Sequence, residues 1–230
     1  MTMPDLHAWD LEPSKAVEVQ NRMRERLVLE WDGRKVVTIG GIDVSYRAGK
    51  GFAAIVVMRF PELIPVEGLT AQVGVGFPYI PGLLAFREAP AVIAAWSKVT
   101  TKPDLLMFDA HGIAHPRGIG LASHLGLWFG IPSIGVAKSR LYGHHKLVGL
   151  NRGEAVELID ENDPTRVIGT VLRTRTNVKP VYVTPGHLID VPNSARFVMA
   201  CCTRYRLPEP TRWADKIAGG AVLHVKREPQ

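Results

Sequence analysis

Apolar residues recur at two different spacings along this chain, and each spacing predicts a different kind of element. Within residues 13–30 they recur every three or four positions, at Ala16, Val19, Met23 and Leu27. This period predicts a helix that begins near Pro13 and packs onto a sheet. The next three apolar segments, 36–46, 51–60 and 63–76, instead predict strands, with a tight turn between the first two. The beginning of the chain therefore predicts an antiparallel sheet.

After residue 82 the pattern changes to helices that alternate with strands. Helices are predicted at 83–99, 118–130, 193–207 and 211–219, and strands at 105–109, 132–137, 166–174 and 179–186. Antiparallel strands followed by such alternation predict an α/β fold with a mixed β-sheet flanked by helices. With no linker or internal repeat in the sequence, we expect one domain over residues 1–230.

Composition narrows the class of protein. The 230 residues are 46% hydrophobic and 22% charged, as in ordinary globular proteins, and no apolar run approaches the roughly 20 residues of a membrane span. The first 13 residues contain no apolar core of a secretory signal, and the only cysteines, Cys201 and Cys202, are adjacent. We therefore expect a cytoplasmic protein without a membrane partner. A net charge of +6 favours a polyanionic partner, and the dispersed basic residues indicate a charged face rather than a tail.

Three acidic residues are the first candidates for chemistry. Asp43 interrupts an apolar row that it shares with Val37 and Ile39, and Asp109 ends the apolar strand 105–108. Either acid alone could simply cap a turn. If the two strands are parallel neighbours, however, both carboxylates lie at one end of the sheet, and Glu88 from the intervening helix can join them. Oxygen ligands without Cys or His at zinc spacing favour Mg²⁺ or Mn²⁺, and phosphodiester hydrolysis is the natural chemistry of such a site.

Three further polar residues, His115, Lys138 and Tyr79, each have one functional and one structural interpretation. His115 could act as a base or orient a water, although a histidine in a turn is often structural. Lys138 could neutralise a phosphate or simply be a solvated lysine, and Tyr79, between two prolines, could contact a displaced base or cover a sheet edge.

A set of sequence blocks distinguishes between these interpretations. The block FPYIPGLLAFRE at 77–88 occurs with GIDVSY, DLLMFDAHGIAHPRGIGLASHLG, PSIGVAKSRLYG, TPGH and YRLPEPTRWAD, in order from about residue 36 to 217. Together they resemble endonuclease V, a family of nucleases that act on deaminated adenine in nucleic acid. The resemblance implies an RNase H-like core over about 36–217.

The same resemblance implies the reaction and the metal. In the family, a metal-activated water breaks the second phosphodiester bond on the 3′ side of deoxyinosine and leaves 3′-hydroxyl and 5′-phosphate ends. Mg²⁺, for which Mn²⁺ can substitute, would be held by Asp43 and Asp109 with the help of Glu88. Some relatives have histidine in place of Asp215, so its contact with the metal could be direct, water-mediated or absent.

Further roles follow from the resemblance. Tyr79 would act as the family's wedge, the backbone of Gly82 and Leu84 would meet the extruded base, and Lys138 would face the scissile phosphate. His115 would contribute to the active site. We therefore expect a monomeric, Mg²⁺-dependent DNA repair endonuclease specific for deoxyinosine. An inosine-specific ribonuclease of the same family is the nearest alternative. A non-catalytic lesion-binding module is disfavoured because all three acids are present.

Overall fold

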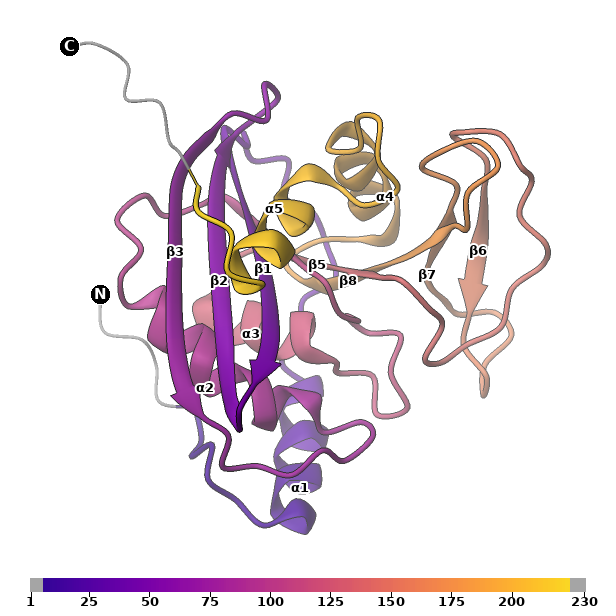
Figure 1. Cartoon of the computed structure of the whole chain (residues 1–230). Coiled ribbons are helices and arrows are strands. Elements are labelled where there is room, and N and C mark those ends of the chain that lie inside the picture. Colours follow the sequence, from indigo (N-terminus) through magenta and orange to yellow (C-terminus); the bar gives the residue numbers. More distant parts are fainter. Residues whose placement is uncertain (1–5, 224–230) are drawn as a thin grey trace, which may run out of the picture.

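Within residues 6–223, the part of the chain that this computed structural model describes, eight strands form one mixed β-sheet (Figure 1). The first five residues of the segment assessed for a secretory signal lie outside this range. The strands are β1 (Thr38–Arg47), β2 (Lys50–Arg59), β3 (Pro65–Gly74), β4 (Leu105–Phe108), β5 (Ser133–Ala137), β6 (Ala155–Ile159), β7 (Val167–Leu172) and β8 (Val181–His187). Their order across the sheet is β3-β2-β1-β4-β5-β8-β7-β6.

The first three strands form the antiparallel unit that the sequence predicts. Arg47 pairs with Lys50, and the two residues between them, Ala48 and Gly49, both have positive φ values. Two such residues in a hairpin turn match the right-handed twist of the strands that they connect. β3 then pairs with β2 in the antiparallel sense.

The short strand β4 lies in the middle of the sheet and is parallel to both of its neighbours, β1 and β5. All four of its residues are buried, which explains its continuous apolar sequence. Ile42 of β1 pairs with Phe108 of β4, so the residues that follow them, Asp43 and Asp109, lie side by side where β4 ends, while β1 continues to Arg47. The predicted parallel arrangement is confirmed.

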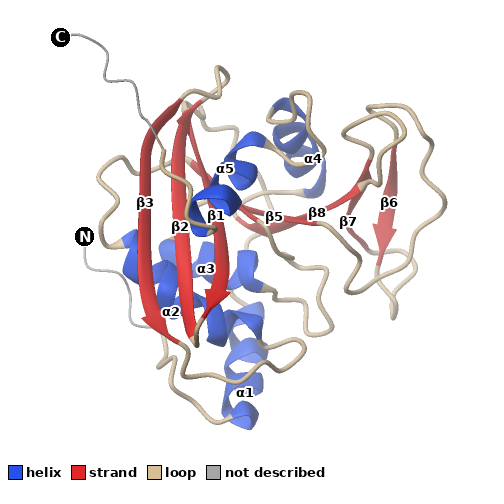
Figure 2. Ribbon diagram, viewed as in Figure 1, coloured by secondary structure: helices blue, strands red, loops and turns tan. Residues whose placement is uncertain are grey.

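Helices cover both faces of the sheet (Figures 1 and 2). They are α1 (Pro13–Arg24), α2 (Leu84–Trp96), α3 (Leu121–Phe129), α4 (Val191–Ala200) and α5 (Glu209–Ala218). α2 and α3 pack on the face that contains Ile42, Leu106 and Phe108. On the opposite face, α4 packs against Ile39 and Met107, and α5 packs against β2. The predicted mixed sheet with flanking helices is confirmed.

Two predictions about α1 are wrong. The helix ends at Arg24 and not at residue 30, because the backbone of Val28 instead bonds to a distant segment, donating to His187 Nδ1 and accepting from Leu188 N. Its buried face does not pack onto the sheet: it packs against Leu83, Phe86 and Ile119, which lie in α2 and in loops.

Two strand assignments also differ. Val37 precedes β1 and is 46% exposed, so it does not belong to the apolar row of Asp43. β6 was not predicted because only Leu158 of its five residues is buried, which leaves too little apolar alternation to recognise an edge strand.

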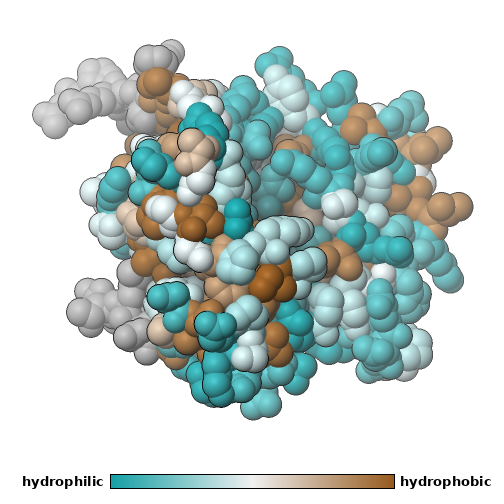
Figure 3. Space-filling view, turned by 60° about the horizontal axis from the view of Figure 1, so that its bottom comes forward, coloured by the Kyte–Doolittle hydropathy of each residue, from teal (hydrophilic) through white to brown (hydrophobic). Residues whose placement is uncertain are grey.

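One face of the molecule carries many polar side chains. Figure 3 looks toward the end of the molecule where α1 lies and shows hydrophilic side chains over most of its right-hand part, with apolar ones scattered among them. In residues 6–223, no helix has the length and apolar character needed to cross a membrane.

Candidate active site

A group of carboxylates forms where β4 ends beside the middle of β1, and its position follows from strand alternation. Ile39, Gly41 and Asp43 point to the same face of β1. Gly41 lies directly against the start of α5: a Cβ atom at this position would lie 2.0 Å from the carbonyl oxygen of Pro210. The absence of a side chain therefore lets α5 approach the face on which Asp43 lies.

This close approach brings Asp215 of α5 to Asp43 and Asp109. Asp43, Asp109 and Asp215 each offer a carboxylate oxygen, and the three oxygens all lie within 4.8 Å of one another. Asp43 and Asp109 are partly buried, whereas Asp215 is exposed. The structure thus brings together three of the four predicted metal-binding acids.

Glu88, the fourth predicted acid, approaches from the other side of the sheet, because α2 packs on the opposite face from α5. Its carboxyl group makes a hydrogen bond with the Tyr46 side chain. Burial raises the pKa of Glu88 to about 8, and repulsion from Asp43 adds to this effect. Glu88 therefore interacts with the acidic group electrostatically without belonging to the set of three.

The acids also disturb each other's ionisation. Burial raises the pKa of Asp43 to about 7, with added repulsion from Asp109 and Asp215. Burial likewise raises the pKa of Asp109 above its usual range. Carboxylates in such a position need a cation to remain ionised together. An all-oxygen donor set of this kind fits a hard divalent cation, with Asp43, Asp109 and Asp215 as its ligands.

Two basic side chains compensate part of this negative charge. Lys138, which follows β5, forms an ion pair with Asp109 and lies 3.7 Å from Asp215 Oδ1. Burial opposes its charged form, but the hydrogen bond to Asp109 and the attraction of the surrounding carboxylates together raise the pKa of Lys138. Arg206 donates to the carbonyl oxygen of Lys138 (2.6 Å) and to that of Pro180 (2.7 Å), so it holds the backbone of Lys138 in place.

A cavity of about 390 Å³ lies next to the carboxylates. The predicted substrate-binding residues Tyr79, Gly82 and Leu84 line it together with Asp109, His115 and Lys138. The Tyr79 side chain at its rim is 71% exposed, as a residue that contacts a partner would be. The N–H groups of Leu84 and Ala85, at the first turn of α2, have no backbone acceptor among the described residues.

The histidines near this cavity are neutral. His115 is buried, and its Nδ1 accepts from the backbone N–H of Arg117 (3.1 Å) while Nε2 donates to the carbonyl oxygen of Gly82 (3.0 Å). Burial lowers the pKa of both His111 and His115 to about 4. His187 accepts from Val28 N and so holds the segment after α1. The structure thus places His115 in contact with the loop at Gly82, and both of its ring nitrogens are already bonded.

Comparison with known proteins identifies the family of this site. The family model for endonuclease V matches residues 21–216. The chain belongs to the endonuclease V family. The endonuclease V of Myxococcus xanthus is 47% identical to it over 217 residues, which cover 93% of this chain and 91% of the relative. The chain is therefore an endonuclease, and its family implies a divalent metal, in agreement with the carboxylates found here.

Solved structures of the family share its RNase H-like fold. The crystal structure of endonuclease V from Streptomyces avermitilis is 39% identical, with a TM-score of 0.86, and covers 94% of this chain and 95% of its own. That of endonuclease V from Ciona intestinalis, in complex with a 24mer DNA containing an inosine followed by a ribo-adenosine, is 27% identical. The TM-score is 0.77, and the match covers 90% of this chain and 95% of the Ciona intestinalis chain.

Sequence reasoning missed three residues that support this site. Arg206 lies within a block that was recognised, but nothing indicated its contact with Lys138. Arg117 and Gln20 both bond to Gly82. Gln20 could have been noticed, because it is a polar residue on the buried face of α1 between Ala16 and Met23.

Proposed function

We propose that this endonuclease V is a Mg²⁺-dependent DNA repair enzyme that recognises deoxyinosine and cuts the second phosphodiester bond on its 3′ side. The products would carry 3′-hydroxyl and 5′-phosphate ends. One observation carries the proposal: a single cavity connects the loop of Tyr79, Gly82 and Leu84 with Asp109 and Lys138. When a base is held in that cavity, the nucleic acid strand to which it belongs lies next to the carboxylates. The inosine-containing DNA bound by the Ciona intestinalis relative supports this assignment.

Recognition would depend on the free N–H groups of Leu84 and Ala85. Hypoxanthine presents an acceptor, O6, where adenine presents a donor, its amino group. Backbone N–H groups at the first turn of a helix favour an acceptor and leave a donor unpaired, which is costly in a buried pocket. Tyr79, held between Pro78 and Ile80-Pro81, would occupy the space that the displaced base vacates.

Catalysis would depend on the acidic group. Asp43, Asp109 and Asp215, with Glu88 nearby, would hold Mg²⁺, which supplies Lewis acidity for phosphodiester hydrolysis. Mn²⁺ would substitute, since it accepts the same oxygen ligands. Lys138 would leave its ion pair with Asp109 when the cation is bound and turn its charge to the scissile phosphate.

The proposal includes a cytoplasmic, monomeric enzyme of one domain that has no membrane partner. Cys201 and Cys202 are both free, which supports a reducing compartment such as the cytoplasm. The described strands all belong to one sheet, which supports a single domain.

The decisive experiment measures cleavage of matched oligonucleotides. Inosine-containing DNA, inosine-containing RNA and their unmodified counterparts would each be incubated with Mg²⁺, Mn²⁺, Ca²⁺ or a chelator. We expect cleavage of inosine-containing DNA with Mg²⁺ and Mn²⁺ only. Cleavage restricted to RNA would replace the proposal by the ribonuclease alternative, and binding without cleavage under every condition would indicate a lesion-binding module.

A further inference from the structure

The carbonyl oxygen of Gly82 accepts three hydrogen bonds, which is unusual for a group in a loop. Gln20 Nε2 lies 2.9 Å from it, Arg117 Nη2 2.6 Å and His115 Nε2 3.0 Å. The donors come from α1 and from the loop after β4, so segments about 60 and 35 residues away in sequence meet on one atom. The peptide group after Gly82 therefore has a fixed orientation.

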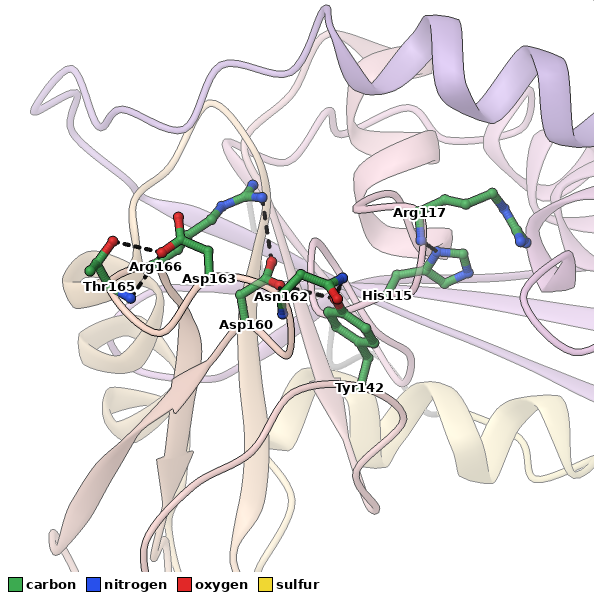
Figure 4. A network of polar contacts seen from close by, with 8 residues as sticks. All are labelled: His115, Arg117, Tyr142, Asp160, Asn162, Asp163, Thr165 and Arg166. Carbon is green, nitrogen blue, oxygen red and sulfur yellow. Dashed lines mark hydrogen bonds and ion pairs between the residues drawn. The ribbon is translucent and has the colours of Figure 1, made fainter.

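The donors are themselves held in place. Arg117 Nε donates to Gln20 Oε1 (2.6 Å), which forces the amide nitrogen of Gln20 to face Gly82. The same nitrogen also lies 3.3 Å from the carbonyl oxygen of Ile119. His115 is fixed as the tautomer that donates from Nε2, because Nδ1 accepts from Arg117 N, as Figure 4 shows. Each of the three donor side chains therefore has only one orientation in which all of its hydrogen bonds are made.

Gly82 needs this support because of its conformation. Its φ is +81°, a value at which a residue with a side chain is strained, and it connects the Tyr79 loop to α2. Leu83 N donates to Ile80 O (2.9 Å) and completes the turn. Leu84 and Ala85, two and three residues after Gly82, line the cavity. A rotation of the Gly82 peptide would change the direction of both N–H groups.

We propose that Gln20, together with Arg117 and His115, is a positioning residue that sets the base preference of the enzyme through the Gly82 carbonyl group. This inference rests on the proposed function, because it assigns the cause of the preference for inosine. Gln20 lines the cavity, and the hydrogen bonds of its side chain go to Gly82, Ile119 and Arg117 rather than to the carboxylates or Lys138. It lies on a helix outside the predicted core of 36–217 and just before the residues that match the family model.

The test compares changes at Gln20 with the same kind of change at its exposed neighbour Asn21. Gln20→Glu keeps the size and the acceptor for Arg117 but places an oxygen against the Gly82 carbonyl oxygen, and Gln20→Leu removes all the hydrogen bonds. Asn21→Asp and Asn21→Leu are the matched controls. Each variant is assayed for binding to an inosine-containing oligonucleotide and to its unmodified counterpart in Ca²⁺, and for single-turnover cleavage with enzyme in excess and Mg²⁺.

We expect the ratio of the two affinities to fall about tenfold in both Gln20 variants, the change that corresponds to losing one buried hydrogen bond. In the Asn21 variants the ratio should stay at the parental value. The maximal single-turnover rate should change much less than the ratio, since the carboxylates are untouched. Partial unfolding would reduce both affinities equally and leave their ratio unchanged, so the ratio separates positioning from stability.

An unchanged ratio in both Gln20 variants would overturn the inference. The same series separates this result from a failure of the proposed function. If the parent protein itself binds and cuts inosine-containing and unmodified oligonucleotides equally, the proposed function is wrong. If the parent discriminates and the Gln20 variants discriminate as well as the parent, only the role of Gln20 is wrong.

Discussion

At the scale of single residues, the site depends on carboxylates that are unfavourable without a cation. Asp43 and Asp109 are partly buried on neighbouring strands, where burial raises the pKa values of both, and repulsion from other carboxylates of the group adds to this effect. Most proteins avoid such an arrangement because a buried unpaired charge is costly. Lys138 compensates part of this charge, and the divalent cation that we propose for the site would compensate the rest.

Replacing either residue should therefore remove activity without unfolding the protein. We expect Asp43→Ala and Asp109→Ala to lower cleavage of inosine-containing DNA by at least a thousandfold, the order of loss found when a catalytic group is removed. Binding of the lesion in Ca²⁺ should be less affected. Cleavage assays with Mg²⁺ check this result, with the exposed Asp10→Ala as control. Near-parental turnover of either variant would show that its carboxylate is not a metal ligand.

Tyr79 gives a second prediction at this scale. Tyr79→Ala should weaken binding to an inosine-containing duplex by roughly 1–3 kcal/mol, the value of one stacked base, while Tyr79→Phe should bind like the parent. Cleavage of a single-stranded substrate should change less, because no base pair has to be opened. Fluorescence anisotropy with matched duplex and single-stranded oligonucleotides measures both effects. Equal duplex binding by Tyr79→Ala and the parent would exclude the wedge role.

The sequence predicted the acids and the cavity loop, but not the residues that hold them. Asp43 was recognisable because it interrupts an apolar row and Asp109 because it ends an apolar strand. Tyr79, Gly82 and Leu84 were recognisable because they lie in a block shared with a known family. Gln20 was not recognisable as a partner of Gly82, since its contact depends on where α1 packs. Hydrogen bonds between distant segments leave no local pattern in a sequence.

At the scale of elements, the contact between α5 and β1 determines whether the acidic group is complete. Gly41 has no side chain, and the backbone of Pro210 at the start of α5 occupies the space where one would be. Five residues later α5 presents Asp215 to Asp43 and Asp109. The position of the third carboxylate is thus controlled by a glycine on another element.

Gly41→Ala should consequently act on the metal site from a distance. A methyl group there would collide with the Pro210 carbonyl group and push the start of α5 away from the sheet. We expect a rise of about tenfold in the Mg²⁺ concentration that gives half-maximal cleavage, equivalent to about 1.4 kcal/mol. Gly74→Ala in β3, where a Cβ atom would meet no neighbour within 4 Å, is the control. Identical Mg²⁺ titrations for the two variants would contradict this account.

Element boundaries were less predictable than element types. The periodicity correctly indicated α2, α3, α4 and α5 and seven of the strands. The end of α1 was missed because Val28 bonds to His187 and Leu188, which no local pattern reveals. β6 was missed because only Leu158 is buried among its five residues, too few to mark so short a strand.

At the scale of the whole molecule, the acidic group should make stability depend on pH when no metal is present. The pKa values of Asp43 and Glu88 are raised to about 7 and about 8. Raised values mean that the folded state holds protons that the unfolded state releases. This contribution to stability is complete below about pH 4 and is lost as the pH rises through 7 to 8.

In the presence of a chelator, the melting temperature should therefore decrease between pH 5 and pH 8. Asp43→Asn cannot ionise at this position, so its free energy of unfolding should fall by roughly 2 kcal/mol less than that of the parent over that interval. This value is smaller than the full pKa shift implies, because solvent partly screens the site. Glu18→Gln, at an exposed position of α1, should behave like the parent. Calorimetry of the three proteins at several pH values provides the measurement. Parallel curves for Asp43→Asn and the parent would contradict the assigned shift.

The docking of α5 on β1 also has a consequence for how the enzyme becomes active during folding. The hydroxyl group of Ser45 donates to the carbonyl oxygen of Ala218, 173 residues further along the chain. Contacts between such distant residues form late, because a large loop must close before they are made. The hairpin of β1 and β2, in contrast, is local and can form early. Nuclease activity should therefore return with the slowest phase of refolding, after most of the sheet has formed.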